Sequence, residues 1–263
     1  MKIAGVRVTV VCDLWNRAKG TQEIINGIVY QKSLQDTGLF EKHQPDCQNI
    51  ASDLAKRYEI DYRIRCEEEF MRMEGISGIV KTIIQERESL SKVLMPGGGP
   101  LTIRAACPQC GLVDKYAINN AYSKDGMTVT FRCPIHNDFS HCIKDEIEKL
   151  QFNCQLFNLV LGRYYEKVPF NYIEICGSDY AGFWQEQLLW RLLDQPILIV
   201  YTPLITDWSG SKLSKSLYLQ EGAYEYLKQA GQEYLLNYQV LKAENKDISL
   251  LWLGNRRLDR ATT

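Results

Sequence analysis

The stretch Phe170-Asn-Tyr-Ile-Glu-Ile-Cys-Gly-Ser-Asp-Tyr-Ala-Gly182 decides the expected fold. Its first seven residues are a compact apolar run of strand length, and they lead into a glycine-rich turn. A helical segment follows over 183–193, and a second apolar strand begins at Pro196. Strand, turn, helix and strand in this order form a βαβ unit. The sequence therefore predicts a parallel sheet with its ligand crevice at the carboxyl ends of the strands.

The turn after the first of these strands carries candidate ligand contacts. Gly177 lets a ligand approach the backbone closely. Asp179 can accept a hydrogen bond from a ribose hydroxyl or from an ammonium group. Asp179 can equally well be the N-cap of the helix that follows, and the sequence leaves both interpretations open.

The second strand leads into a loop with two closely spaced cations, Thr206-Asp-Trp-Ser-Gly-Ser-Lys-Leu-Ser-Lys-Ser-Leu-Tyr218. Lys212 and Lys215 are separated by Ser214, and Ser216 follows. Lysine acts as a point charge on phosphate oxygens, and the hydroxyl groups add donors. This pattern predicts a polyphosphate-binding loop, and the alternative is a solvated loop of lysine and serine.

Four potential metal ligands stand in two short motifs, Cys107-Pro-Gln-Cys110 and Cys133-Pro-Ile-His136, with 22 residues between them. Asp125-Gly126 supplies a hairpin turn in the interval. This spacing is typical of a zinc ribbon, in which a closed tetrahedral site is structural rather than catalytic. We expect the metal to supply most of the order of so small a segment, on the order of 10 kcal/mol. His141 or Cys142 is an alternative to His136 as the fourth ligand.

Composition limits the class of protein. The chain has 263 residues, of which 45% are hydrophobic and 24% charged, with a net charge of −1. These values predict a globular protein and argue against one held on nucleic acid by bulk charge. No apolar run reaches the roughly 18 residues of a membrane span, so we expect no membrane partner. Nine cysteines without a secretory signal pattern favour metal binding in a reducing, cytoplasmic setting.

The remaining elements follow from hydrophobic periodicity and turn signals. We expect strands over 2–12 and 59–66, the second half-exposed with its charged residues facing solvent, and helices over 21–29, 46–58, 67–95 (broken near Gly75 and Gly78), 145–163 and from 219 onward. Pro96–Pro100 is the clearest linker. These elements predict an α/β fold in three regions. They are a Rossmann-like domain over 1–100 and 143–218, a zinc-ribbon insert over 101–142 and a C-terminal helical segment over 219–263.

Taken in order, these motifs resemble the catalytic region of a class I lysyl-tRNA synthetase of the archaeal type. Lys212–Ser216 is similar to the KMSKS loop of that family, with Leu213 in place of Met. Gly177-Ser178-Asp179-Tyr180 resembles its Gly-Lys-Asp-His turn, and Cys107–Gly111 its Cys-x-x-Cys-Gly insert. The similarity spans about residues 5 to 218. It implies a class I Rossmann-type sheet.

The chain departs from the family pattern in several places. Its three histidines, His43, His136 and His141, do not form the family's His-Ile-Gly-His signature. We expect the first, central strand that carries this signature to be missing. The alternative is that Val6–Cys12 is that strand and Asn16–Gly20 a degenerate signature loop. Ser178 and Tyr180 replace a lysine and a histidine, and the Trp-Pro-x-x-Trp region has no clear counterpart. We expect the helical anticodon-binding region of the family to be missing as well.

The resemblance implies ATP-dependent activation of an amino acid, lysine first, and its transfer to tRNA, or a remnant of this activity. Lys212 and Lys215 would then stabilise charge on the leaving pyrophosphate, and Ser214 and Ser216 would hold the loop closed. Gly177, Asp179 and Tyr180 would line the adenosine or amino-acid pocket, with ATP entering with Mg²⁺. The alternatives are a catalytically inactive paralogue or split subunit that binds tRNA or a protein partner completing the fold, and a zinc module on an unrelated α/β domain.

Overall fold

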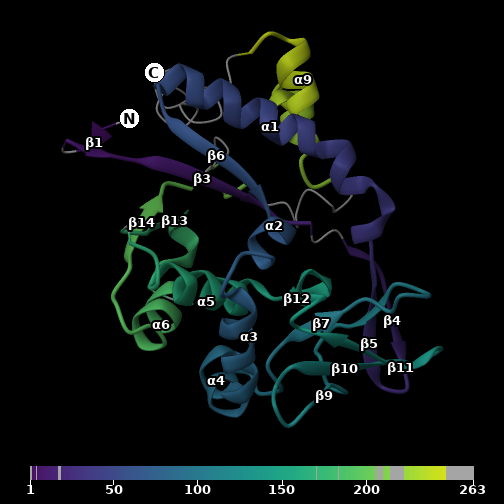
Figure 1. Cartoon of the computed structure of the whole chain (residues 1–263). Helices are drawn as coiled ribbons and strands as arrows, with labels where there is room; N and C mark the ends of the chain where they lie inside the picture. Colours follow the sequence, from purple (N-terminus) through teal and green to yellow (C-terminus); the bar gives the residue numbers. More distant parts are fainter. Residues whose placement is uncertain are drawn as a thin grey trace.

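The computed structural model describes residues 2–3, 5–16, 19–169, 171–182, 184–204, 206, 210–213 and 222–246, which form a mixed α/β molecule (Figure 1). The strands are β1 (Lys2–Ile3), β2 (Val6–Arg7), β3 (Thr9–Leu14), β4 (Lys19–Ile25), β5 (Ile28–Ser33), β6 (Asp61–Cys66), β7 (Ile103–Ala105), β8 (Leu112–Asp114), β9 (Ala121–Tyr122), β10 (Thr128–Cys133), β11 (Asn137–Cys142), β12 (Leu150–Phe152), β13 (Ile173–Gly177) and β14 (Leu198–Thr202). The α-helices are α1 (Leu39–Tyr58), α2 (Glu67–Met71), α3 (Ile76–Gln85), α4 (Arg87–Leu94), α5 (Cys154–Tyr165), α6 (Trp184–Arg191), α8 (Glu225–Gln229) and α9 (Tyr238–Ala243). The short 3-10 helices are η1 (Gln35–Thr37), η2 (Ile147–Lys149), η3 (Ser178–Tyr180) and η4 (Glu233–Leu235).

Parallel strand pairing occurs at two places. β13 and β14 pair in register from Ile173↔Leu198 to Gly177↔Thr202, with α6 between them in the chain, so the predicted βαβ unit is confirmed. β3 and β6 pair from Thr9↔Asp61 to Leu14↔Cys66. Among the residues that the structure describes these pairs are separate two-stranded sheets, so a continuous Rossmann-type sheet is not confirmed.

The helix expected over 21–29 is wrong, because this segment forms the antiparallel hairpin β4–β5. Its turn is Asn26-Gly27, with φ of 52° and 78°, the left-handed pair that a tight two-residue hairpin turn requires. Apolar residues at 24, 25, 28 and 29 fit both a helical face and a two-residue hairpin. The Asn-Gly dipeptide between them is the signal that distinguishes the two.

The other expected helices agree better with the structure than the one over 21–29. α1 covers the helix expected over 46–58 and starts earlier, and the helix expected over 67–95 is divided into α2, α3 and α4, with a break at Gly75, which has φ 88°. The segment 145–163 is α-helical only from Cys154, after the single 3-10 turn η2. Before that residue, β12 pairs antiparallel with β7. No helix within the described ranges is long and apolar enough to cross a membrane.

The main core joins the helices to the ribbon region. Ile83 of α3 and Phe157 of α5 are fully buried in the same cluster as Ile103 of β7 and Val129 of β10. The residues 101–142, called the ribbon here, therefore share the main core, so packing contributes to their order beside any metal; how much the metal contributes stays a prediction. β5 also pairs with β8, which ties the hairpin β4–β5 to the ribbon region. The limits of the three regions stay a prediction.

Candidate metal centre and anion site

The four predicted metal ligands converge at one point. Each of Cys107, Cys110, Cys133 and His136 offers one ligand atom, and these atoms all lie within 4.8 Å of one another. Sγ of Cys110 lies 3.5 Å from Sγ of Cys133, and Nδ1 of His136 lies 3.7 Å from Sγ of Cys133 and 3.6 Å from Sγ of Cys107. Ligand atoms about 2.0–2.3 Å from one tetrahedral ion would have such separations. The cluster can therefore bind a metal such as zinc.

Local backbone structure holds the two ligand loops. In the first loop the Gly111 amide donates to the Cys107 carbonyl at 2.7 Å, and the Cys107 amide donates to the Leu112 carbonyl at 2.9 Å. Gly111 has φ 69°, where a side chain would be strained. In the second loop the His136 amide donates to Sγ of Cys133 at 3.4 Å. The backbone of each loop thus directs its two ligand atoms towards those of the other loop.

The electrostatics of the first loop favour a thiolate at Cys107 rather than at Cys110. Burial raises the pKa of the Cys107 thiol, but hydrogen bonds from the backbone amides of Cys110 and Gln109 and from the thiols of Cys133 and Cys110 together outweigh it and bring the pKa to about 7. Burial raises the pKa of the Cys110 thiol to about 11. Cys107 is 3% exposed and Cys133 2% exposed, so water has little access to either sulfur. A thiolate is the form of cysteine that binds metal.

The alternative fourth ligands do not join the cluster. His141 lies on β11, where its Nδ1 is 3.2 Å from a carboxylate oxygen of Glu146. Cys142 is the end of the same strand and pairs in register with Thr128. Among the described residues neither belongs to the group of converging ligand atoms, which has His136 as its fourth member.

The βαβ unit brings together a candidate anion site. Asp179 follows β13 directly, and Lys212 lies in the loop after β14, where Thr206 and Lys212 form an antiparallel bridge. The Lys212 ammonium donates to a carboxylate oxygen of Asp179 and forms an ion pair with it. This contact lowers the pKa of Asp179 and raises the pKa of Lys212. Asp179 lies in the 3-10 helix η3, and α6 begins only at Trp184, so Asp179 is not the N-cap of α6.

Gly177 and Tyr180 lie beside this ion pair. A Cβ at Gly177 would stand 2.5 Å from Oδ1 of Asp179, so glycine is what lets the carboxylate fold back over the strand end. Tyr180 is 40% exposed and its hydroxyl contributes to the raised pKa of Lys212. Gly177, Asp179, Tyr180 and Lys212 are thus brought together. Ser214, Lys215 and Ser216 lie outside the described residues.

A buried polar network, which the sequence analysis missed, lies where β3 and β6 end. The Arg65 guanidinium donates to both carboxylate oxygens of Asp13, at 2.6 and 2.9 Å, and to the Tyr165 hydroxyl at 3.1 Å. Arg65 is 8% exposed and Tyr62 39% exposed, so the expected alternation of the half-exposed strand is wrong at these two positions. Arg63 is exposed and Ile64 half-buried, as expected. The Tyr165 ring stacks on Tyr172, whose hydroxyl contacts Glu174 of β13.

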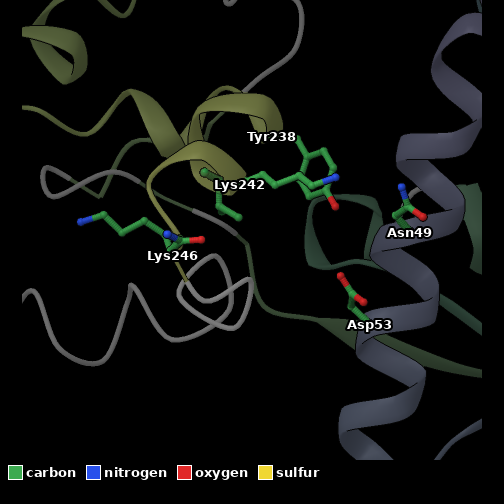
Figure 2. Close-up of a pocket in the computed structure, with 7 residues that line it drawn as sticks. Asn49, Asp53, Tyr238, Lys242 and Lys246 are labelled. Carbon is green, nitrogen blue, oxygen red and sulfur yellow. The ribbon is translucent and has the colours of Figure 1, made fainter.

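A separate polar cleft of about 460 Å³ lies between α1 and α9 (Figure 2). Asn49 and Asp53 line it from α1, and Tyr238 and Lys242 from α9, while the ammonium group of Lys246 points away from α1. None of the predicted site residues lines this cleft, and its lining side chains are mostly exposed.

Comparison of the chain with protein-family models and with curated proteins gives no match.

Proposed function

We propose that this chain is a class I aminoacyl-tRNA synthetase-like protein that binds ATP at the carboxyl ends of β13 and β14. The observation that carries the proposal is the contact between Lys212 and Asp179, which joins the loops after two adjacent parallel strands. That is where α/β proteins bind nucleotides. Lys212 offers a cation for a phosphate, and Asp179 offers an acceptor for a ribose hydroxyl or an ammonium group.

In the proposed reaction, a carboxylate oxygen of the amino acid attacks the α-phosphorus of ATP, and pyrophosphate leaves. Lys212, with Lys215 from the same loop, stabilises the charge that develops on the pyrophosphate. Gly177 keeps the strand end open to the ligand, because a Cβ there would collide with Asp179. ATP enters with Mg²⁺, which neutralises phosphate charge. The aminoacyl group then passes to tRNA, with lysine as the first amino acid to test.

The metal centre has a structural role in this proposal. Its four ligand positions are filled by protein, so zinc bound there has no open position for a substrate. Figure 1 supports the separation of roles, because β13 and β14 lie at one side of the molecule and β10 and β11 at another. Zinc would fix the ribbon, and ATP would bind elsewhere.

A second candidate function is a catalytically inactive synthetase-like protein, or one part of a split enzyme, that binds tRNA or a protein partner. The positions of the histidines favour it. His136 belongs to the metal cluster, His141 contacts Glu146, and His43 is exposed on α1. A histidine pair that holds ATP phosphates in the family is therefore not available from these residues.

Nucleotide binding and amino-acid activation should be measured separately on zinc-loaded protein. We expect saturable ATP binding that weakens about tenfold or more in Lys212→Ala, because a charge-assisted contact contributes roughly 1.5–3 kcal/mol. Gly177→Ala should weaken binding in the same direction by displacing Asp179. The matched control is Lys242→Ala, which removes an exposed lysine on α9 and should change nothing.

ATP–pyrophosphate exchange with each amino acid then separates the two candidate functions. Lysine-dependent exchange that is lost in Lys212→Ala supports the enzyme. ATP or tRNA binding without exchange supports the inactive protein. The proposal fails if the zinc-loaded wild type binds no ATP, or if Lys242→Ala weakens binding as much as Lys212→Ala does.

A further inference from the structure

One face of the β13–β14 sheet is aliphatic and exposed to solvent. Ile173 pairs with Leu198, and Ile175 pairs with Val200. Alternate residues of a strand point to the same face, and residues paired in register share that face. These four side chains are 42%, 62%, 59% and 44% exposed, in the order just given. Parallel sheets are normally covered on both faces, so this open face is unusual.

The other face of the same sheet is more enclosed. Glu174, Cys176, Ile199 and Tyr201 alternate with the exposed residues, and all four are half-buried. Burial raises the pKa of Glu174 and of Cys176, which is consistent with their position away from solvent. The exposure is therefore a property of one face and not of a loosely packed segment.

Two exposed aromatic residues lie near the ends of these strands in the chain. Trp190 of α6 is 57% exposed, and its indole N–H donates to the carbonyl of Ile197, the residue before β14. Tyr180, just after β13, is 40% exposed. At roughly 100 Å² for each half-exposed large side chain, the four residues of the face present roughly 400 Å². That area is about half of the roughly 800 Å² that each partner contributes to a standard protein interface, which fits a weak, concentration-dependent dimer.

Charge favours a second copy of this chain as the occupant. Ile173, Ile175, Leu198 and Val200 carry no charge, and the ionic groups at the carboxyl end of the sheet, Lys212 and Asp179, neutralise each other. The whole chain has a net charge of −1, so two copies repel each other only weakly. An uncharged aliphatic face can be buried against the same face of a second copy about a two-fold axis without charge repulsion, and sheets pack face to face about 10 Å apart.

We propose that the face formed by Ile173, Ile175, Leu198 and Val200 is the self-association surface of a symmetric homodimer. The two-fold axis passes through the packed sheets, and each copy covers the face that the other leaves open. This interface does not depend on nucleotide, and the dimer forms without ATP. A failure of the proposed ATP site therefore leaves it unaffected.

The test is the molar mass of the full, zinc-loaded chain in solution, measured by light scattering and sedimentation from low micromolar to near-millimolar concentration. The wild type should rise from 30.3 kDa to twice that value. Ile175→Lys and Leu198→Lys should each weaken the dimer by about a hundredfold or more, because symmetry buries the new charge twice. The control is Ile24→Lys, because Ile24 is 73% exposed on β4 and lies outside the interface.

Ile175 and Leu198 are the most exposed residues of the face, so these substitutions should leave the monomer folded. Far-UV circular dichroism and bound zinc, both unchanged from wild type, establish this for each variant. A wild type that stays at 30.3 kDa at every concentration overturns the proposal and leaves the face to a different partner. A dimer that survives both substitutions, or that only Ile24→Lys disrupts, overturns it as well.

Discussion

Cys133→Ser is the sharpest test of the metal centre. Cys133 is 2% exposed, and its sulfur lies within 4 Å of both the Cys110 sulfur and the His136 ring. A serine hydroxyl fills nearly the same space but stays protonated at neutral pH and is a poor zinc ligand. The substitution therefore removes one ligand of four with little change in packing.

The expected size of the effect follows from the ligand count. Structural zinc sites in small domains contribute about 10–16 kcal/mol, or about 3 kcal/mol for each of four ligands. Zinc affinity should then fall about a hundredfold, which lowers the free energy of unfolding by up to about 2.7 kcal/mol once free zinc exceeds the dissociation constant of the variant. The variant should nevertheless stay folded, because Val129 and Phe131 of β10 are 0% and 4% exposed within the main core.

Zinc content, competition with a chromophoric chelator and urea unfolding measure these quantities. Cys142→Ser is the matched control, because Cys142 lies on the same hairpin outside the ligand cluster. Wild type and Cys142→Ser should bind one zinc ion per chain with equal affinity. A wild type that binds no zinc, or an equal loss of zinc affinity in the two serine variants, would refute a zinc site formed by Cys133 and its neighbours.

Two further predictions concern the buried polar groups. Asp13→Asn leaves the Arg65 guanidinium buried without its carboxylate and should lower the free energy of unfolding in urea by about 3–5 kcal/mol. A loss below about 1 kcal/mol would show that solvent reaches Arg65. Burial, and then the charge of Asp13, raise the pKa of Glu174 above 4.5, despite a hydrogen bond from Tyr172. The folded protein therefore keeps a proton that the unfolded chain has released, and stability declines as pH rises from about 4.5 towards the raised pKa. Glu174→Gln should flatten this decline and make the protein more stable than wild type at pH 7. Urea unfolding midpoints at pH 4 and pH 7 measure both effects. A variant with the same pH dependence of stability as wild type would contradict this role of Glu174.

The sequence by itself determined features that depend on near neighbours in the chain. The spacing of Cys107, Cys110 and Cys133 predicted a cluster of metal ligands in two short loops, whereas only the fold decided for His136 over His141 or Cys142 as the fourth member. The order of strand, turn, helix and strand over 173–202 fixed a parallel pair, since a crossover through a helix joins parallel strands. The Asn26-Gly27 turn was also present in the sequence, but the apolar pattern around it fitted a helix equally well.

Only the tertiary structure decided features that join distant segments. Arg65 is buried because Asp13, 52 residues away, supplies a carboxylate, and no pattern within β6 records that partner. Lys212 meets Asp179 across 33 residues because the parallel register places both strand ends together. The tertiary structure also decided that the ribbon packs into the same core as α3 and α5. Local periodicity and turn residues indicate which elements form, whereas burial and pairing depend on which surfaces meet in the folded chain.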